Sequence, residues 1–212
     1  MSRNDQLNYW NTVANEKKFT LPIPMHLISN HLEWNASILD VGCGYGRTLN
    51  ELVLEGFEQL IGVDFSSKMI ERGKSLYPEL DLKTLKTPAL PFPDESFDAV
   101  ILFAVLTCIE SNEEQIALLS EIHRVLKPAG IVLISDFLLN TDPRNLDRYK
   151  KYQDIFEQYG TFKLPNGGVC RHHTLDWVRE STSTFQEISL ETIQYTTMNG
   201  NPSNGYSYIG RK

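Results

Sequence analysis

Hydrophobic and polar positions change their period repeatedly between residues 24 and 136. Short apolar runs that predict strands lie at 37–41, 59–63, 81–85, 99–103 and 131–135. Helical patterns lie between them at 47–55, at 66–77 with Ser66 as N-cap, and at 113–126. The last pattern places on one apolar stripe Ile116, Leu119, Ile122, Val125 and Leu126. This alternation predicts a mostly parallel sheet, covered by helices on both faces, whose ligand-binding loops share one edge.

The last third of the chain departs from this alternation. Residues 143–159 predict a helix rich in Tyr, Arg, Lys and Asp. Strand patterns follow at 185–197 and 206–209, with the Gly- and Asn-rich segment 199–205 between them. Two strands joined by turn residues are typical of a hairpin, so we expect the sheet to end in an antiparallel pair.

Composition and charge narrow the classes of function. The 212 residues carry 27 acidic against 20 basic side chains, which argues against a broad phosphate-binding surface and against a nucleic-acid substrate. The longest apolar stretch, 99–109, is shorter than the ~20 residues of a membrane span, and residues 1–10 resemble no secretory signal. Three cysteines without CxxC spacing indicate a reducing compartment. We therefore expect a cytoplasmic protein without membrane insertion; the sequence carries no signal of oligomeric state.

A glycine-rich loop lies where the first predicted strand meets the first helix, in the segment Asp40-Val-Gly42-Cys-Gly44-Tyr-Gly46. Glycines allow a tight turn and let ligand atoms approach the backbone. Asp64 ends the second predicted strand about 20 residues later, where a carboxylate can accept two hydrogen bonds from the ribose hydroxyls of an adenosine.

Two ligands compete for this loop. The nicotinamide dinucleotide fingerprint is G-x-G-x-x-G, whereas Gly46 gives the spacing G-x-G-x-G. Asp40 also places a negative charge just before the loop, which is unfavourable beside a pyrophosphate and favourable beside the ammonium group of a methionine moiety. The loop favours S-adenosylmethionine, with an NAD-dependent oxidoreductase as the alternative.

Four segments, in order, resemble the class I S-adenosylmethionine-dependent methyltransferases. They are ILDVGCGYGRT, IGVDFSSKMI, LPFPDESFDAVILFAVL and EIHRVLKPAGIVLIS, and the last two resemble the small-molecule, methyltransferase type 11-like branch. The resemblance covers about residues 36–136. It implies a Rossmann-like three-layer α/β sandwich with a mostly parallel seven-stranded sheet that ends in an antiparallel hairpin. It also implies methyl transfer from S-adenosylmethionine to a small-molecule acceptor through oxygen, nitrogen or carbon, with S-adenosylhomocysteine as the product.

The same resemblance implies a set of donor-binding residues. They are Asp40, Gly42, Gly44 and Gly46 at the loop, Asp64 on the ribose, Phe65 and Thr87 toward the adenine, and Phe103 and Ala104 from the fourth strand. Lys86 stands where this branch often carries an acid facing the adenine amine, and because Lys cannot accept a hydrogen bond another group is expected there. A non-catalytic S-adenosylmethionine-binding protein is a further alternative, since its donor motifs would look the same.

We expect a single domain with four parts. Residues 1–35 form N-terminal lid helices, 36–136 the donor-binding core, 137–182 an acceptor-side insertion and 183–212 the terminal hairpin. Trp10 and Phe19 either close over the donor or simply pack the first helix. In the insertion, Tyr149, Tyr152, Phe156 and Tyr159 would shape an acceptor pocket, or else Ile155, Phe156 and Tyr159 would form a buried stripe.

The segment Arg171-His172-His173-Thr174 carries the candidate catalytic residues, His173 and His172. The pKa of a histidine lies near neutral pH, so either imidazole is a candidate general base. In the alternative interpretation, one histidine bonds a backbone carbonyl and Thr174 caps the next helix. Cys108 lacks an activating neighbour for thiolate chemistry, and no ligand spacing predicts a metal.

Overall fold

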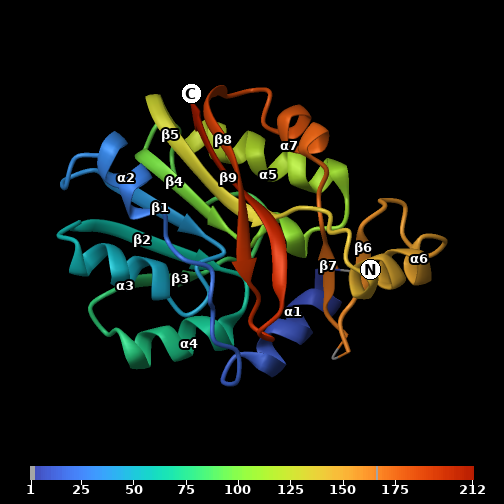
Figure 1. Cartoon of the computed structure of the whole chain (residues 1–212). Coiled ribbons are helices and arrows are strands. Elements are labelled where there is room, and N and C mark those ends of the chain that lie inside the picture. Colours follow the sequence, from blue (N-terminus) through green and yellow to red (C-terminus); the bar gives the residue numbers. More distant parts are fainter. Residues whose placement is uncertain (1–2, 166) are drawn as a thin grey trace.

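The computed structural model describes residues 3–165 and 167–212; residues 1–2 of the expected lid segment and residue 166 of the expected insertion lie outside them. One seven-stranded sheet forms the centre, in the order β3-β2-β1-β4-β5-β9-β8 (Figure 1). The strands are β1 (Ser37–Val41), β2 (Gln59–Asp64), β3 (Asp81–Thr84), β4 (Phe97–Phe103), β5 (Leu126–Phe137), β8 (Gln186–Thr196) and β9 (Pro202–Arg211). The first five pair in parallel, and β9 runs antiparallel to both β5 and β8. The predicted α/β sandwich with a terminal antiparallel hairpin is confirmed.

Helices cover both faces of the sheet, as the alternation predicts (Figure 1). The helices of the described residues are α1 (Arg3–Val13), α2 (Met25–His31), α3 (Arg47–Leu54), α4 (Ser67–Leu76), α5 (Asn112–Val125), α6 (Pro143–Tyr152), α7 (Leu175–Ser181) and the short 3₁₀ helix η1 (Leu106–Cys108). One apolar core lies between the sheet and α2, α3 and α4, and a second between the sheet, α5 and α7. The side chain of Ser66 caps α4 by accepting from the Met69 amide, as predicted. No helix in the described part of the chain is long and apolar enough to cross a membrane.

Two local predictions in the core are wrong. Ile116 is 45% exposed, so the apolar stripe of α5 is narrower than its sequence suggested, although Leu119, Ile122, Val125 and Leu126 are buried. The fifth strand begins at Leu126 rather than at residue 131, and residues 127–130 form an irregularity inside β5. There the pairing with β4 shifts between Phe97 and Ala99, and Ala129 has a positive φ of 64°, as in a β-bulge.

The insertion after β5 differs most from its prediction. The helix α6 ends at Tyr152 rather than Tyr159, and the chain then continues to Gly160, whose carbonyl accepts from the His172 amide at 3.1 Å. That contact begins a small antiparallel pair, β6 (Thr161–Lys163) with β7 (Val169–Arg171), which the sequence did not predict. The proposed buried stripe is wrong as well, because Ile155 is 62% and Tyr159 54% exposed.

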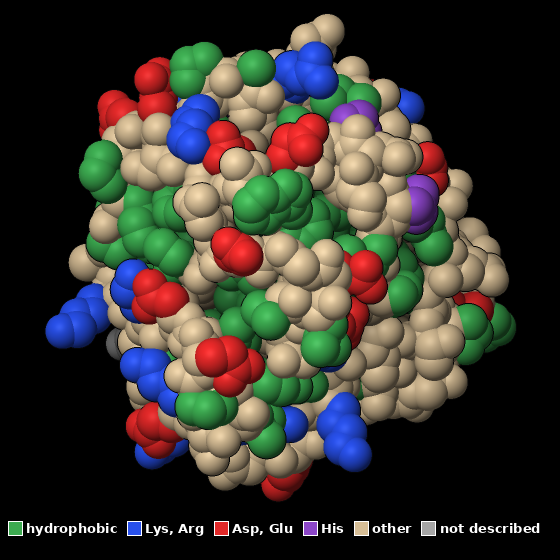
Figure 2. Space-filling view, turned by 90° about the vertical axis from the view of Figure 1, so that its left-hand side faces the viewer, with side chains coloured by type: hydrophobic (Ala, Val, Ile, Leu, Met, Phe, Trp, Pro, Cys, Tyr) green, Lys and Arg blue, Asp and Glu red, His purple; other side chains and the backbone are tan. Residues whose placement is uncertain are grey.

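The surface agrees with the mixed composition. On the face shown in Figure 2, on the side of α2 and α3, Lys and Arg side chains are interspersed with Asp and Glu side chains. Such a face carries no continuous positive field of the kind that attracts a nucleic-acid backbone.

Candidate active site

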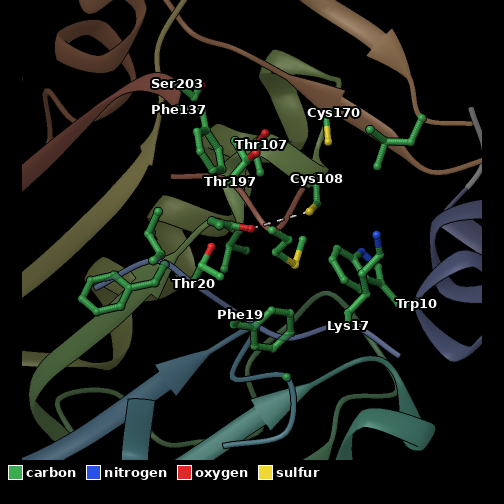
Figure 3. Close-up of a pocket in the computed structure, with 18 of the residues that line it drawn as sticks. Trp10, Lys17, Phe19, Thr20, Thr107, Cys108, Phe137, Cys170, Thr197 and Ser203 are labelled. Atoms are coloured by element: carbon green, nitrogen blue, oxygen red, sulfur yellow. Dashed lines mark hydrogen bonds between the residues drawn. The ribbon is translucent and has the colours of Figure 1, made fainter. Parts of the chain in front are cut away.

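A cavity opens at the carboxyl edge of the parallel strands, where the ligand-binding loops were expected to meet (Figure 3). Its walls come from the ends of β1, β2 and β4, from the segment between α1 and α2, and from α6, β7 and the β8–β9 turn. Seven predicted donor-site residues line it: Asp40, Gly42, Gly44, Asp64, Phe65, Phe103 and Ala104. The fold therefore brings together residues that are spread over more than 60 positions of the sequence.

The glycine loop has the backbone conformation that its sequence predicts. Gly42, Gly44 and Gly46 have φ values of 75°, 55° and 81°, in the left-handed region that other residues rarely adopt. A Cβ atom on Gly42 would lie 2.5 Å from the Val105 side chain, and one on Gly44 would lie 2.2 Å from the Phe19 ring. Gly46 does not line the cavity. It is the N-cap of α3, and its left-handed conformation connects the glycine loop to that helix.

Asp64 joins the two loops at this edge. One carboxylate oxygen accepts from the Gly44 amide at 2.9 Å and the other from the Ser66 amide at 2.7 Å. Burial raises the pKa of Asp64 to about 6, and the two amide hydrogen bonds oppose that rise. Each carboxylate oxygen still has a free acceptor direction, so the side chain can hold the loop and bind a hydroxyl at the same time.

Asp40 is the least satisfied charge of the site. It lies near the end of β1, is 2% exposed, and its Oδ2 has no hydrogen-bond partner among the described residues. Burial, followed by the neighbouring charge of Asp64, raises the pKa of Asp40 to about 7. A buried acceptor without a partner is unusual in a folded protein, and on a cavity wall it points to a donor group on a ligand.

Of the remaining predicted donor-site residues, three line the cavity and one does not. Phe65, Phe103 and Ala104 line the cavity, and Ala104 adopts a left-handed φ of 56° at the end of β4, a strained conformation typical of functional loops. Thr87 is not on the cavity wall. It lies on an exposed turn, where its hydroxyl donates to the Ala89 carbonyl at 3.2 Å.

The N-terminal segment covers the opening of the glycine loop. Residues from it that line the cavity are Tyr9, Trp10, Lys17, Phe19, Thr20 and Leu21, and Figure 3 labels Trp10, Lys17, Phe19 and Thr20. The Phe19 ring stacks on Tyr45, with centroids 4.9 Å apart and an angle of 11° between the planes. The Arg72 guanidinium of α4 lies over the Tyr45 ring, 3.9 Å from its centroid. It also donates to the Ala14 and Lys17 carbonyls, at 2.6 and 2.7 Å. The role of Arg72 could not be predicted from the sequence, because a single arginine on a helix surface carries no signal of such an anchor.

The opposite end of the cavity is aromatic and positively charged. Arg144, Asn145 and Arg148 of α6 line it together with Phe137 and Phe162. The Arg148 guanidinium lies 5.1 Å from the centroid of the Phe162 ring. These two arginines could not be recognised as site residues from the sequence, because charged positions on a polar helix are usually solvated. Their i, i+4 spacing indicates only that both side chains lie on the same face of the helix.

His172 lines the cavity, but its accepting nitrogen is already occupied. The Tyr149 hydroxyl accepts from the Asn140 amide at 3.1 Å, so we assign its own proton to the hydrogen bond with His172 Nδ1, 2.6 Å away. The neutral ring then carries its proton on Nε2. Burial, followed by the charges of Arg148 and Arg144, lowers the pKa of His172 to about 3.

His173 lies away from the cavity wall, with both ring nitrogens hydrogen-bonded. Its Nε2 is 3.0 Å from the Gln115 amide nitrogen, and its Nδ1 is 3.2 Å from the Phe137 carbonyl. Burial is the main cause that lowers the pKa of His173 to about 3. Thr174 caps α7 by accepting from the Trp177 amide at 3.1 Å. These contacts are the ones expected under the alternative, structural interpretation of this segment.

The thiols of the cavity are protonated. Cys43, Cys108 and Cys170 all line it, and burial raises the pKa of each, to about 12 for Cys170. A protonated thiol is a poor nucleophile. Among the described residues, no group of three or more His, Cys, Asp or Glu side chains is placed to hold a metal ion.

Comparison with known proteins connects this geometry to a family. A family model described as a methyltransferase domain matches residues 39–134. Human methyltransferase-like protein 27 is 34% identical over 145 residues, which is 68% of this chain and 54% of that protein. A demethylmenaquinone methyltransferase of Lysinibacillus sphaericus is 29% identical over 181 residues, covering 76% of this chain and 73% of the relative. The chain thus spans about half the length of the human relative.

A solved structure supports the same relationship. The structure of an S-adenosylmethionine-dependent methyltransferase from Methanosarcina mazei superposes with a TM-score of 0.83 at 25% identity. The match covers 90% of this chain and 98% of that one, so it extends well beyond residues 36–136, where the sequence motifs lie.

Proposed function

We propose that this chain, which belongs to the class I S-adenosylmethionine-dependent methyltransferases, transfers a methyl group from S-adenosylmethionine to a small organic acceptor. The observation that carries the proposal is Asp40, a buried carboxyl on the cavity wall whose Oδ2 lacks a partner among the described residues. The ammonium group of a methionine moiety supplies the charge and the hydrogen bond that this oxygen lacks.

The rest of the loop edge fits the same donor. Gly42 and Gly44 line the cavity without a side chain, so a ligand can approach the backbone of the loop there. In the proposal, Asp64 accepts from ribose hydroxyls, and Phe65 and Phe103 give apolar contact to the adenosine part of the donor. When bound, S-adenosylmethionine supplies a sulfonium methyl group that is open to in-line displacement. The residues of the cavity align the acceptor with that group and exclude water.

We further propose that the acceptor arrives with its attacking atom unprotonated. The Tyr149 hydroxyl occupies Nδ1 of His172, so the imidazole carries its proton on Nε2 and has no free nitrogen to accept a proton from an acceptor. His173 is held by Gln115 and the Phe137 carbonyl. On these contacts the two candidate catalytic histidines serve as structural and donating groups, and proton removal falls to solvent or to the ionisation of the acceptor itself.

The four-part division of the chain is retained in the proposal. Within the lid segment 1–35, Phe19 and Trp10 would close over the donor; 36–136 would bind the donor, 137–182 would bind the acceptor, and 183–212 would form the terminal hairpin. The lining of the cavity favours this division, because its donor-side and acceptor-side residues come from separate parts of the sequence.

A thermal-shift comparison tests the donor directly. S-adenosylmethionine and S-adenosylhomocysteine at 100 times their dissociation constants should each add ~2.7 kcal/mol of stability, or about 5–10 °C for a domain of this size. NADH at the same excess should give no shift. Stabilisation by NADH alone, or by none of the three, contradicts the proposal. A chain that binds the donor but forms no S-adenosylhomocysteine with any acceptor of a broad panel would be a binding protein rather than an enzyme.

A further inference from the structure

The cavity has two ends of opposite charge. Asp40 and Asp64 are the carboxyl groups that line it, both beside the glycine loop. Four basic side chains line it as well: Arg47 beside the glycine loop, where it forms an ion pair with Glu51, and Lys17, Arg144 and Arg148 elsewhere on the wall. The whole chain is acidic, with a formal charge of -7, so this gathering of cations around a half-enclosed space is a local feature and does not reflect composition.

The two arginines of α6 have few competing partners. Arg148 forms no ion pair with any described residue; its Nη1 donates to Asn145 Oδ1 in a long contact of 3.4 Å. Arg144 has one distant ion pair, with Nε 3.6 Å from Asp142 Oδ1, and donates to the Pro202 carbonyl at 3.4 Å. Both side chains are half-buried, so part of their hydration has already been removed without a strong internal replacement.

The positive charges of these groups affect the pKa values of two residues that line the cavity. Arg148 and Arg144 both contribute to the lowered pKa of His172. The charges of Arg148 and Lys17 oppose the rise that burial imposes on the pKa of Cys170. Because His172 and Cys170 both line the cavity, the positive charges of Arg144, Arg148 and Lys17 all act on its interior.

The wall between these charges is aromatic. The His172 ring lies 5.0 Å from Phe162, nearly perpendicular to it, and 5.7 Å from Phe137. The Phe137 ring faces the cavity from the end opposite Phe19 (Figure 3). A flat apolar body fits such a surface, and an anionic group attached to it would reach the guanidinium groups at its rim.

We infer that the acceptor is a flat organic acid, whose anionic group binds Arg144 and Arg148 while its apolar body rests on Phe137 and Phe162. The inference rests on the proposed function, since it assigns the acceptor end of the same cavity. A cationic sulfonium donor beside Asp40 and Asp64 and an anionic acceptor beside the arginines would each meet the opposite charge. Arg144 and Arg148 are thus specificity-determining residues; neither is placed at the donor.

Matched acid and amide pairs test this inference. We would titrate benzoate, cinnamate and 2-naphthoate, each against its uncharged amide, into protein saturated with S-adenosylhomocysteine. Charge-assisted hydrogen bonds to a guanidinium predict that at least one acid binds about tenfold or more tightly than its amide. In the double variant Arg144→Gln/Arg148→Gln this preference should fall to within about threefold, while S-adenosylhomocysteine affinity stays unchanged. Arg148→Lys should retain part of the preference because it keeps the charge.

A matched control lies on the same helix. Lys150→Gln/Lys151→Gln also removes two positive charges from α6, at exposed positions that do not line the cavity, and should leave the acid preference intact. Equal binding of acids and amides, no binding of any acid, or a preference that survives in the arginine variant overturns the inference. Failure of S-adenosylhomocysteine to bind overturns the proposed function instead. In that case the same pairs, titrated into the free protein, still decide the inference.

Discussion

The two ends of the cavity are built in different ways. The donor end consists of loops that leave the parallel strands β1, β2 and β4, so the sheet fixes the position of each backbone group. The acceptor end is assembled from α6, β7 and the β8–β9 turn, none of which belongs to the strand–helix alternation. A rigid edge suits a donor shared by a whole family, whereas added segments can change without disturbing the sheet.

Charge is also handled differently at the two ends. Asp40 and Asp64 are nearly inaccessible, and burial holds their pKa values at about 7 and 6. The arginines of the acceptor end are half-buried and keep contact with solvent. The donor end therefore depends strongly on the protonation state of its carboxyls, and the acceptor end should depend mainly on ionic strength.

The largest effect is expected for a substitution at the donor end, at Asp64. Asp64→Asn keeps the shape of the side chain and one accepting oxygen, but removes the charge that strengthens the hydrogen bonds to a ribose. We expect S-adenosylhomocysteine affinity to fall about 100-fold, measured by isothermal titration calorimetry. Asp81→Asn, at an exposed position of β3, is the control and should bind normally. Unchanged affinity in Asp64→Asn would show that the ribose contact has been misplaced.

Acidic pH should weaken the same end. A protonated carboxyl no longer attracts an ammonium group, so donor affinity is present above the pKa and is lost as pH falls through it. With the pKa of Asp40 at about 7, affinity for S-adenosylhomocysteine should fall roughly tenfold between pH 8 and pH 6. Titrations across this range should show the decline in the native chain and a flatter profile in Asp40→Asn. A profile that is flat in both would separate Asp40 from the donor.

A smaller effect is expected where the two ends meet under the N-terminal segment. Phe19→Ala removes the ring that stacks on Tyr45 over the glycine loop. An aromatic pair contributes about 0.5–1.5 kcal/mol beyond its buried area, so the donor should dissociate roughly 3–10 times faster in a stopped-flow displacement experiment. Lys18→Ala, at the adjacent exposed position, should dissociate at the native rate. Equal rates for both variants would mean that Phe19 only packs the segment.

The smallest functional effect is expected at His172. Replacing it with Phe leaves the buried Tyr149 hydroxyl without its acceptor, so the free energy of unfolding should fall by about 1–3 kcal/mol in chemical denaturation. Turnover of an identified acceptor should stay within about threefold of native, because the imidazole does not take up the proton. A loss of 10²-fold or more with unchanged donor affinity would instead identify His172 as the general base.

The donor end could be predicted from the sequence because its signals are local. The glycine spacing and the acid at Asp64 fix a turn and a strand end, and the structure places both on one cavity. Thr87 was harder to place, since a turn before the fourth strand gives no indication of which way it faces.

The acceptor end could not be predicted in the same way. The strands β6 and β7 have three residues each, too few for a period to be seen, and their pairing depends on the distant contact between Gly160 and His172. Arg144 and Arg148 look like solvated helix positions until α6 is placed against Phe162. Such tertiary contacts are not encoded by any single segment.

A crystal structure with S-adenosylhomocysteine and the tightest-binding acid of the panel would show whether donor and acid share the cavity. We expect one cavity that holds both molecules, with ribose oxygens about 3 Å from the Asp64 carboxylate and the acid group at a similar distance from the Arg144 and Arg148 guanidinium groups. The sulfur of the donor should face the ring that rests on Phe137 and Phe162. A donor bound away from the glycine loop, or an acid group directed away from α6, would contradict this expectation.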